Sequence, residues 1–179
     1  MIDALKTTES TQTNSRKPIE ILIVDSNPAD TRMTIDAFRS AGGKSGLHCV
    51  SDGQEALLFV RKAGQYVDCP LPDMIFLDLS LPSVSGLEVL KAIKSTPELM
   101  HIPIVVASGS QNPEDIRAVY ALNGNCFIRR PTELGQLVRF IETCYEFWNS
   151  VVTLSSKSPS EVARVAASSE STPRYERTF

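Results

Sequence analysis

Five short apolar runs, separated by segments with helical periodicity, constrain the fold of this chain most strongly. The runs are IEILIV (19–24), LHCV (47–50), DMIFL (73–77), PIVVA (103–107) and NCFI (125–128). Most are rich in β-branched residues and continuous rather than alternating, which is typical of strands buried on both faces of a parallel sheet. This order predicts an α/β protein with (βα)5 topology, in which right-handed crossovers give a doubly wound parallel sheet.

Capping residues and apolar periodicity mark five helices between and after these runs. The predicted caps are Asn27, Asp52, Asn112 and Thr132-Glu133. The apolar positions with helical spacing are Met33, Ala37, Phe38 and Ala41; Ala56, Leu57 and Val60; Leu87, Leu90 and Ile93; Ile116, Val119 and Tyr120; and Leu134, Leu137, Val138, Ile141, Tyr145 and Trp148. The last of these groups is predicted to face the sheet.

The length of 179 residues suits one ordinary domain with tails. Residues 1–17 are mostly polar and are predicted to form a flexible arm. Residues 151–179 are predicted to be an extension with a flexible, Ser-rich tail, which leaves 18–150 as the folded domain. The residues after 150 are few and mostly polar, so we expect no DNA-binding or catalytic domain there and no enzymatic output.

Charge and cysteine spacing narrow the class of protein further. The net charge of −3 disfavours a nucleic-acid binder, which usually carries a basic stripe. No apolar run approaches the ~18 residues of a membrane span, and the polar N-terminus does not resemble a signal peptide. The four cysteines share no CxxC spacing and indicate no zinc site. We therefore expect a cytoplasmic protein with no membrane or nucleic-acid partner.

Acidic, hydroxyl and basic residues stand directly after four of the apolar runs. Asp25 follows the first, Asp78 the third and Ser108 the fourth, while Arg130 lies two residues beyond the fifth. Ligands of open α/β sheets bind outside the carboxyl ends of the strands, so we expect these side chains to converge. Two carboxylates there can hold a hard cation such as Mg²⁺, and a carboxylate beside that cation can accept a phosphoryl group.

The segments ILIVDSNPAD, PDMIFLDLSLPSVSGLEVL, IPIVVASGS and NCFIRRP, in this order, resemble the receiver domain of two-component response regulators. The resemblance covers residues 18–150. It implies a flavodoxin-like fold with strand order 2-1-3-4-5 and Mg²⁺-dependent phosphotransfer from a histidine kinase to an aspartate. The segments NPADTRMTIDAF, DGQEALLFV and YEFWNSVVTL are also similar to small, often dimeric regulators paired with phytochrome-type histidine kinases.

The resemblance assigns roles to individual residues. Asp78 matches the phosphoacceptor, Asp25 matches the first acid of the metal-binding pair, and Ser80 matches the position whose main-chain carbonyl binds the metal. Ser108 matches the hydroxyl residue that moves toward the new phosphate. Phe127 matches the aromatic switch residue that turns inward when this hydroxyl moves.

Two positions depart from the family pattern. Ser26 replaces the second acid of the pair, and Arg130 replaces the lysine. The first change removes a formal negative charge and makes Ser26 a doubtful metal ligand, so we expect weaker Mg²⁺ binding. The planar fork of Arg130 can hold Asp78 or Asp25 bidentately, which a lysine cannot do. Two hypotheses follow: a weakened site that is still phosphorylated, or a degenerate receiver that works as an interaction module without phosphorylation.

A wide apolar surface on the last helix predicts how the signal leaves the domain. Besides the stripe assigned to the sheet, a neighbouring stripe consists of Phe140, Cys144, Phe147 and Val151. Exposed apolar area of this kind usually marks an interface, although the fourth helix or the tail would also be able to cover it. We favour a homodimer through the fourth helix, the fifth strand and the fifth helix.

A flavin-binding protein or small hydrolase is a third hypothesis, because flavodoxin-like folds host many functions. Asp25-Ser26-Asn27-Pro28 after the first run is not a Gly-rich phosphate-binding loop, and no histidine base is in view. Both observations argue against this hypothesis.

Overall fold

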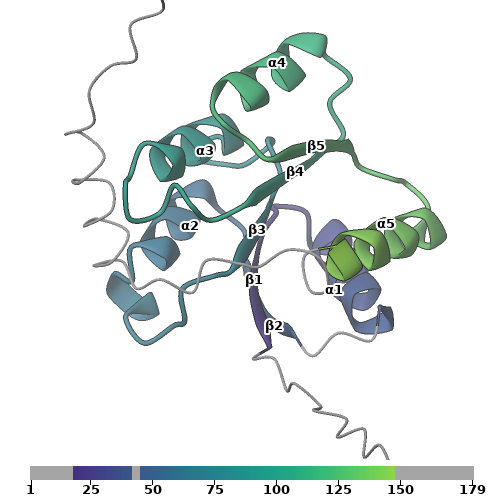
Figure 1. Ribbon diagram of the computed structural model, residues 1–179, viewed down its shortest axis with the longest axis horizontal. Helices are drawn as coiled ribbons and strands as arrows, with labels where there is room; N and C mark the ends of the chain where they lie inside the picture. Colours follow the sequence, from purple (N-terminus) through teal and green to yellow (C-terminus); the bar gives the residue numbers. More distant parts are fainter. Residues whose placement is uncertain (1–17, 42–44, 148–179) are drawn as a thin grey trace, which may run out of the picture.

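Strands and helices alternate along the chain in the computed structural model, which describes residues 18–41 and 45–147. The elements are β1 (Ile19–Val24), α1 (Pro28–Ser40), β2 (Ser45–Val50), α2 (Gly53–Val60), the 3-10 helix η1 (Gly64–Tyr66), β3 (Met74–Leu77), α3 (Gly86–Lys94), β4 (Ile104–Ser108), α4 (Pro113–Ala121), β5 (Cys126–Arg129) and α5 (Leu134–Glu146). The predicted (βα)5 order is therefore confirmed (Figure 1).

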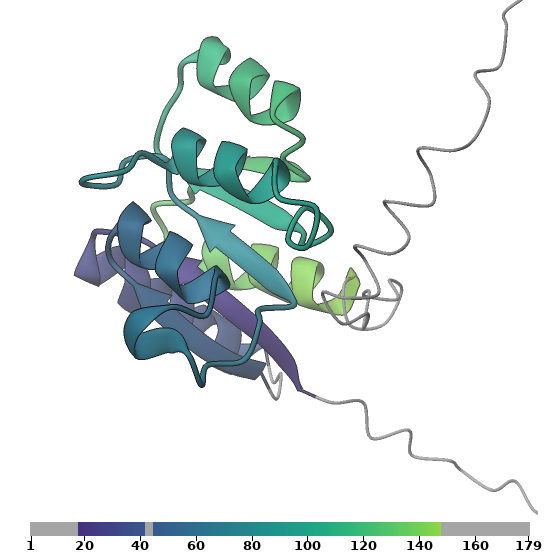
Figure 2. The same cartoon turned by 90° about the vertical axis from the view of Figure 1, so that its left-hand side faces the viewer.

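The strands form one five-stranded parallel sheet in the order β2-β1-β3-β4-β5, as the resemblance implied. Helices α1 and α5 lie side by side on one face of the sheet, and α2, α3 and α4 cover the other (Figure 1). The view in Figure 2 shows the strands running between these two helical layers. The reversal of strand order places β1 and β3 next to each other, where a ligand site of this fold is expected.

Two apolar clusters, one on each face, fix the sheet. The α1/α5 face contains Phe38, Phe76 and Leu137, and the opposite face contains Ile75 and Val89, all almost fully buried. Burying a side chain of this size stabilises a fold by about 1.5–3 kcal/mol. Strands β1, β3 and β4 are buried along nearly their whole length, so the residues that directly follow them are attached to tightly packed main chain.

Three of the four predicted helix caps are confirmed. Asn27, Asp52 and Asn112 accept hydrogen bonds from main-chain amides in the first turns of α1, α2 and α4. The prediction for Thr132-Glu133 is wrong, because Glu133 is the N-cap residue of α5 and its side chain makes no capping bond.

Several residues differ from the helical pattern predicted for them. Tyr120 is 52% exposed, because its hydroxyl reaches the edge of β5 and accepts a hydrogen bond from the Phe127 amide at 3.3 Å. Leu134 is also exposed, since it is the first residue of α5 and precedes the turn that packs on the sheet through Leu137. Helix α4 fully buries only Val119, whereas the shorter α2 buries five residues.

Some predictions fall on residues outside the described ranges. They are the arm at 1–17, the extension at 151–179, Trp148 and Val151. Within residues 18–41 and 45–147, no helix has the length and apolar character needed to cross a bilayer.

Candidate functional site

Asp25 and Asp78 are the first residues after the neighbouring strands β1 and β3. Their main-chain amides continue the sheet, with Asp78 donating to the Val24 carbonyl at 2.9 Å and Asp25 to the Val50 carbonyl at 3.1 Å. Both residues are buried, at 4% and 8% exposure. Ser108, the last residue of β4, is 1% exposed, so the strand ends deliver two acids and a hydroxyl residue to one edge of the sheet.

Arg130 extends from the end of β5 into this acidic site. Its Nη1 atom lies 2.7 Å from Asp25 Oδ2, and its Nη2 atom lies 3.8 Å from Asp78 Oδ1. Nη2 also donates a hydrogen bond to the Ala107 carbonyl at 2.9 Å. The guanidinium therefore reaches both predicted acids, but it forms a close ion pair with Asp25 and only a long one with Asp78.

The carboxyl group of Asp25 is in an environment that disfavours its charge. Burial raises the pKa of Asp25 above its ordinary value, and the nearby carboxylates of Asp78 and Asp30 add to this increase. The Asn27 amide, which donates to Asp25 Oδ1 at 2.9 Å, and the Arg130 guanidinium act in the opposite direction. A cation beside Asp25 would relieve this electrostatic strain.

The loop after β3 holds Asp78 through main-chain contacts. Asp78 Oδ1 accepts a hydrogen bond from the Leu79 amide at 2.9 Å. The Gly86 amide donates to the Leu79 carbonyl, and a Cβ atom added to Gly86 would lie only 2.2 Å from the Asp78 carbonyl oxygen. The start of α3 therefore packs directly against the loop that orients Asp78.

Ser26 and Ser80 contact each other across the site. The Ser26 hydroxyl donates a hydrogen bond to the Ser80 main-chain carbonyl at 3.0 Å. This carbonyl is the expected main-chain metal ligand, so the residue that replaces the second acid is bonded to an atom that the metal would need.

The donor atoms at this edge fit a hard divalent cation. Carboxylate and carbonyl oxygens are the ligands that Mg²⁺ and Mn²⁺ prefer, and Asp25, Asp78 and Ser80 supply such atoms. Within the described residues there is no group of three or more His, Cys, Asp or Glu side chains placed to bind a metal. A metal ion at this edge would therefore depend on main-chain carbonyl and water oxygens besides the two carboxylates.

Ser108 ends β4, next to β3, whereas Phe127 lies on the edge strand β5, and the two residues have different contacts. The Ser108 hydroxyl accepts a hydrogen bond from the Ser110 amide at 3.2 Å, and its carbonyl accepts one from the Arg130 amide at 3.0 Å. Phe127 is partly buried against the cluster on the α2/α3/α4 face. Its amide is bonded to Tyr120, which connects β5 to α4.

The apolar residues predicted to form an interface on α5 differ in exposure. Phe140 is partly buried, with its ring centroid 6.2 Å from that of Phe76 in the core. Cys144 is also partly covered, and burial raises the pKa of its thiol to about 12. Phe147 is 47% exposed, so the accessible part of this stripe lies toward the end of α5.

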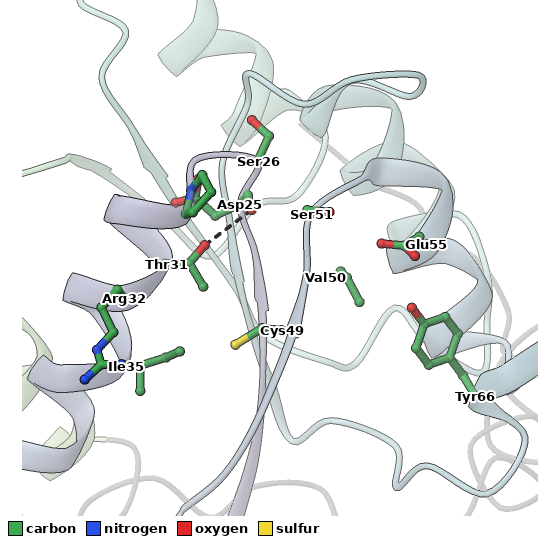
Figure 3. A pocket seen from close by; sticks show the side chains of 11 residues that line it. Asp25, Ser26, Thr31, Arg32, Ile35, Cys49, Val50, Ser51, Glu55 and Tyr66 are labelled. Carbon is green, nitrogen blue, oxygen red and sulfur yellow. Dashed lines mark hydrogen bonds between the residues drawn. The ribbon is translucent and has the colours of Figure 1, made fainter.

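A groove of about 410 Å³ opens beside the acidic site, between α1 and α2 (Figure 3). Asp25 and Ser26 form one end, next to Thr31, whose hydroxyl donates to the Asp25 carbonyl at 3.4 Å. Cys49 and Tyr66 line its other parts. The groove therefore borders the site at Asp25, whose own side chain is only 2% exposed.

A receiver is the class of protein that this sheet order and these strand-end acids define. Residues 21–142 match the response regulator receiver domain family, and the chain belongs to that family. It is 36% identical over 140 residues to response regulator Rcp1 of Synechocystis sp., covering 78% of this chain and 95% of that protein.

Two solved structures of response regulators are also similar to this chain. One is the phosphorylated cyanobacterial phytochrome response regulator RcpA, at 40% identity and a TM-score of 0.75. The other is the Mn²⁺-bound form of Rcp1, at 35% identity and a TM-score of 0.73. Each match covers 78% of this chain and all of the other. Receiver domains bind a divalent metal ion, in agreement with the oxygen donors found here.

Sequence reasoning missed one charged residue of the site. Asp30, in the first turn of α1, accepts a hydrogen bond from Arg130 Nη1 at 2.7 Å. In the sequence it looks like an ordinary first-turn acid of a helix that follows a capping asparagine. Its position one helical turn after Asn27, near the end of β1, is the signal that would have placed it beside the site.

Proposed function

We propose that this protein is a single-domain response regulator that accepts a phosphoryl group on Asp78 from a histidine kinase and signals through protein–protein contacts. The observation that carries the proposal is the position of the Asp78 carboxylate. It lies next to Asp25 at the sheet edge, is oriented by the Leu79 amide, and has no close ion pair with Arg130. One carboxylate oxygen is therefore available as a nucleophile.

In the proposed reaction, a carboxylate oxygen of Asp78 attacks the phosphorus atom of a phosphohistidine. The new P–O bond forms as the P–N bond breaks, and the imidazole leaves with the electron pair of that bond. Arg130 is placed to pair with an oxygen of the new phosphoryl group, because its Nη2 atom is already 3.8 Å from Asp78 Oδ1.

Asp25, Asp78 and the Ser80 carbonyl would hold Mg²⁺. When bound, the metal ion would reduce the repulsion between the carboxylates and the incoming phosphoryl oxygens. Ser26 is not proposed as a direct ligand, because its hydroxyl donates to the Ser80 carbonyl. The relative Rcp1 supports this assignment through its Mn²⁺-bound structure.

Ser108 and Phe127 are proposed to report phosphorylation. Ser108 is buried at the end of β4, two strands from Asp25, and its hydroxyl bonds only to an amide of its own loop among the described residues. The family pattern implies that this hydroxyl moves toward a phosphate on Asp78 and that Phe127, on the adjacent strand β5, turns inward in response. The Tyr120–Phe127 hydrogen bond would pass the change to α4.

A degenerate receiver that works without phosphorylation is not favoured. In the form of that hypothesis in which Arg130 pairs with Asp78, the structure has only a 3.8 Å contact, whereas the close partners of Arg130 Nη1 are Asp25 and Asp30 at 2.7 Å. The likeness to phosphorylated RcpA also supports a phosphorylated receiver.

Incubation with acetyl phosphate and Mg²⁺, followed by intact mass measurement, tests the assignment. We expect a mass gain of one phosphoryl group that is lost in Asp78→Asn. Asp73→Asn is the matched control, because Asp73 precedes the same strand at its opposite end and bonds to the Glu20 amide. No gain in the unmodified protein, or an equal gain in Asp78→Asn, would contradict the proposal.

The proposed upstream partner is a phytochrome-type histidine kinase, which is supported by the phytochrome regulator RcpA among the similar structures. Four free cysteines support a reducing, cytoplasmic location. We expect output through binding rather than catalysis, as for the response regulators that this chain resembles.

A homodimer through α4, β5 and α5 is the proposed output state. The exposed ring of Phe147 would lie at its centre, on the same stripe as Phe140 and Cys144, whereas the predicted contact Val151 lies outside the described residues. Sedimentation over a range of protein concentrations should show dimerisation, and Phe147→Asp should weaken it. Val67→Asp is the control, because Val67 is also exposed but is distant from α5 in the sequence, and this variant should dimerise normally. A monomer at all concentrations would contradict this part of the proposal.

A further inference from the structure

Asp30 is a third carboxylate of the acidic site, contributed by α1 rather than by a strand end. Arg130 Nη1 lies 2.7 Å from Asp30 Oδ2 and 2.7 Å from Asp25 Oδ2, so one nitrogen bridges two carboxylates. With Asp78, three carboxylates surround one guanidinium and the site has a formal charge of −2. Asp30 therefore supplies the negative charge that is absent at Ser26.

The contact with Arg130 goes beyond the local role of Asp30 in α1. Locally, Asp30 accepts a hydrogen bond from the Asn27 side chain at 2.9 Å and lies in the first turn, where an acid favours the helix dipole. Neither effect requires Arg130. The Arg130 contact joins residues 100 positions apart and involves a guanidinium that is only 15% exposed.

Arg130 and a divalent cation both require Asp25. A metal ion on Asp25 would repel the guanidinium, and a largely buried guanidinium is destabilised if it is left without any carboxylate partner. Asp30 is 30% exposed, belongs to the first turn of α1, and contacts Arg130 Nη1 through its own carboxylate oxygen rather than through Asp25. It can therefore keep Arg130 paired after Asp25 has turned to the metal.

We propose that Asp30 is a positioning residue that retains Arg130 when a divalent cation takes Asp25, so that the site holds both cations together. This inference rests on the proposed function, because it assumes that Asp25 is a metal ligand. It explains how a receiver with Ser26 and Arg130 keeps a usable metal site: the third acid is placed to hold the arginine instead of the metal.

Titration calorimetry with Mn²⁺ on the full chain, without a phosphoryl donor, tests the coupling. We expect Asp30→Asn to weaken Mn²⁺ binding about tenfold, and by about twofold or less when Arg130→Met is also present, because coupled neighbours are non-additive. Asp36→Asn is the matched control, since it removes an acid from the same helix where it pairs with Arg32. This control should leave Mn²⁺ affinity unchanged.

Equal weakening by Asp30→Asn in both backgrounds would mean that Asp30 acts through its charge alone and would overturn the proposal. So would unchanged affinity in the single variant. If acetyl phosphate gave no mass gain while the effect of Asp30→Asn on Mn²⁺ affinity depended on Arg130 as expected, the result would count only against phosphorylation of Asp78.

A measurement on the unmodified protein avoids any variant that fails to fold. In ¹⁵N NMR spectra, the side-chain N–H signals of Arg130 should stay protected from solvent exchange when Mg²⁺ is added, because Asp30 still holds the guanidinium. Loss of these signals at saturating Mg²⁺, while other arginine signals are unchanged, would show that Arg130 is released and would refute the role of Asp30.

Discussion

The Ser26 hydroxyl donates a hydrogen bond to the Ser80 main-chain carbonyl at 3.0 Å, across the site where a second acid is expected in this family. This bond joins the loop after β1 to the loop after β3, which are adjacent strands. It also occupies a lone pair of a proposed metal ligand. The second lone pair of this oxygen stays available to a metal ion, so the expected weakening of metal binding comes from the missing carboxylate.

Ser26→Asp should tighten Mn²⁺ binding about tenfold, because it adds a negative charge and a carboxylate ligand to the site. Calorimetric titration measures the change. Ser51→Asp is the matched control, since it adds the same charge at the end of β2, where Ser51 lines the groove beside the site. Combining Ser26→Asp with Arg130→Lys should raise both metal affinity and phosphorylation. Unchanged Mn²⁺ affinity in Ser26→Asp and in its combination with Arg130→Lys would argue against the view that Ser26 weakens the metal site.

Asp25→Asn should stabilise the metal-free protein at neutral pH. Because burial raises the pKa of Asp25, the folded state binds more protons than the unfolded state above the ordinary value of 3.8. The contribution of Asp25 to the free energy of unfolding therefore falls as pH rises through this window. Urea denaturation should show a gain from Asp25→Asn that is larger at pH 7 than near pH 3.5. A gain that is independent of pH would contradict the assigned cause.

Lys94→Met should lower the free energy of unfolding by about 2 kcal/mol. Lys94 Nζ donates to the carbonyls of Met100 and Ile102 and to Asn125 Oδ1, at 3.0, 2.7 and 2.9 Å. Burial lowers the pKa of its ammonium group to about 8, so the group is still charged at neutral pH. Urea denaturation at pH 7 provides the measurement. Lys91→Met, on the exposed side of the same helix, should have a much smaller effect.

Gly86→Ala should destabilise the fold by about 2 kcal/mol, because the new methyl group overpacks the loop that carries Asp78. A Cβ atom at Gly86 would approach the Asp78 carbonyl oxygen and the Leu79 Cα atom to 2.2 and 2.6 Å. The same substitution at Gly109, where no atom lies within 4 Å, should change stability by less than about 0.5 kcal/mol. Thermal unfolding of the two variants compares them directly, and similar losses would contradict the packing argument.

The strands were predictable because each of the buried ones is a continuous apolar run. β2 begins at Ser45, two residues earlier than predicted, because edge pairing with β1 continues through main-chain bonds after the apolar residues end. The site acids were predictable for a similar reason: Asp25 and Asp78 directly follow buried strands. What the resemblance added was the strand order and the roles of these residues.

Contacts made by the polar ends of side chains were not predictable from periodicity. Asp30 has the sequence context of a first-turn acid, and only the folded arrangement of α1 and the segment after β5 brings it to Arg130. Tyr120 occupies an apolar helical position, but its hydroxyl finds a partner at the free edge of β5 and the ring remains exposed. In both cases the hydrogen bond made by the polar end of the side chain determines where the side chain lies, and the spacing of apolar residues carries no information about such bonds.

The shallow seating of α4 has a consequence for motion. With Val119 as its sole fully buried side chain, this helix can separate from the sheet at a much lower free energy than α2. Local opening of this kind makes main-chain amides exchange with deuterated water well before the whole domain unfolds. The amides of Val119–Ala121 should thus exchange sooner than those of Leu57–Val60, and a ligand or modification that slows them would be acting on a helix that is held less tightly than α2.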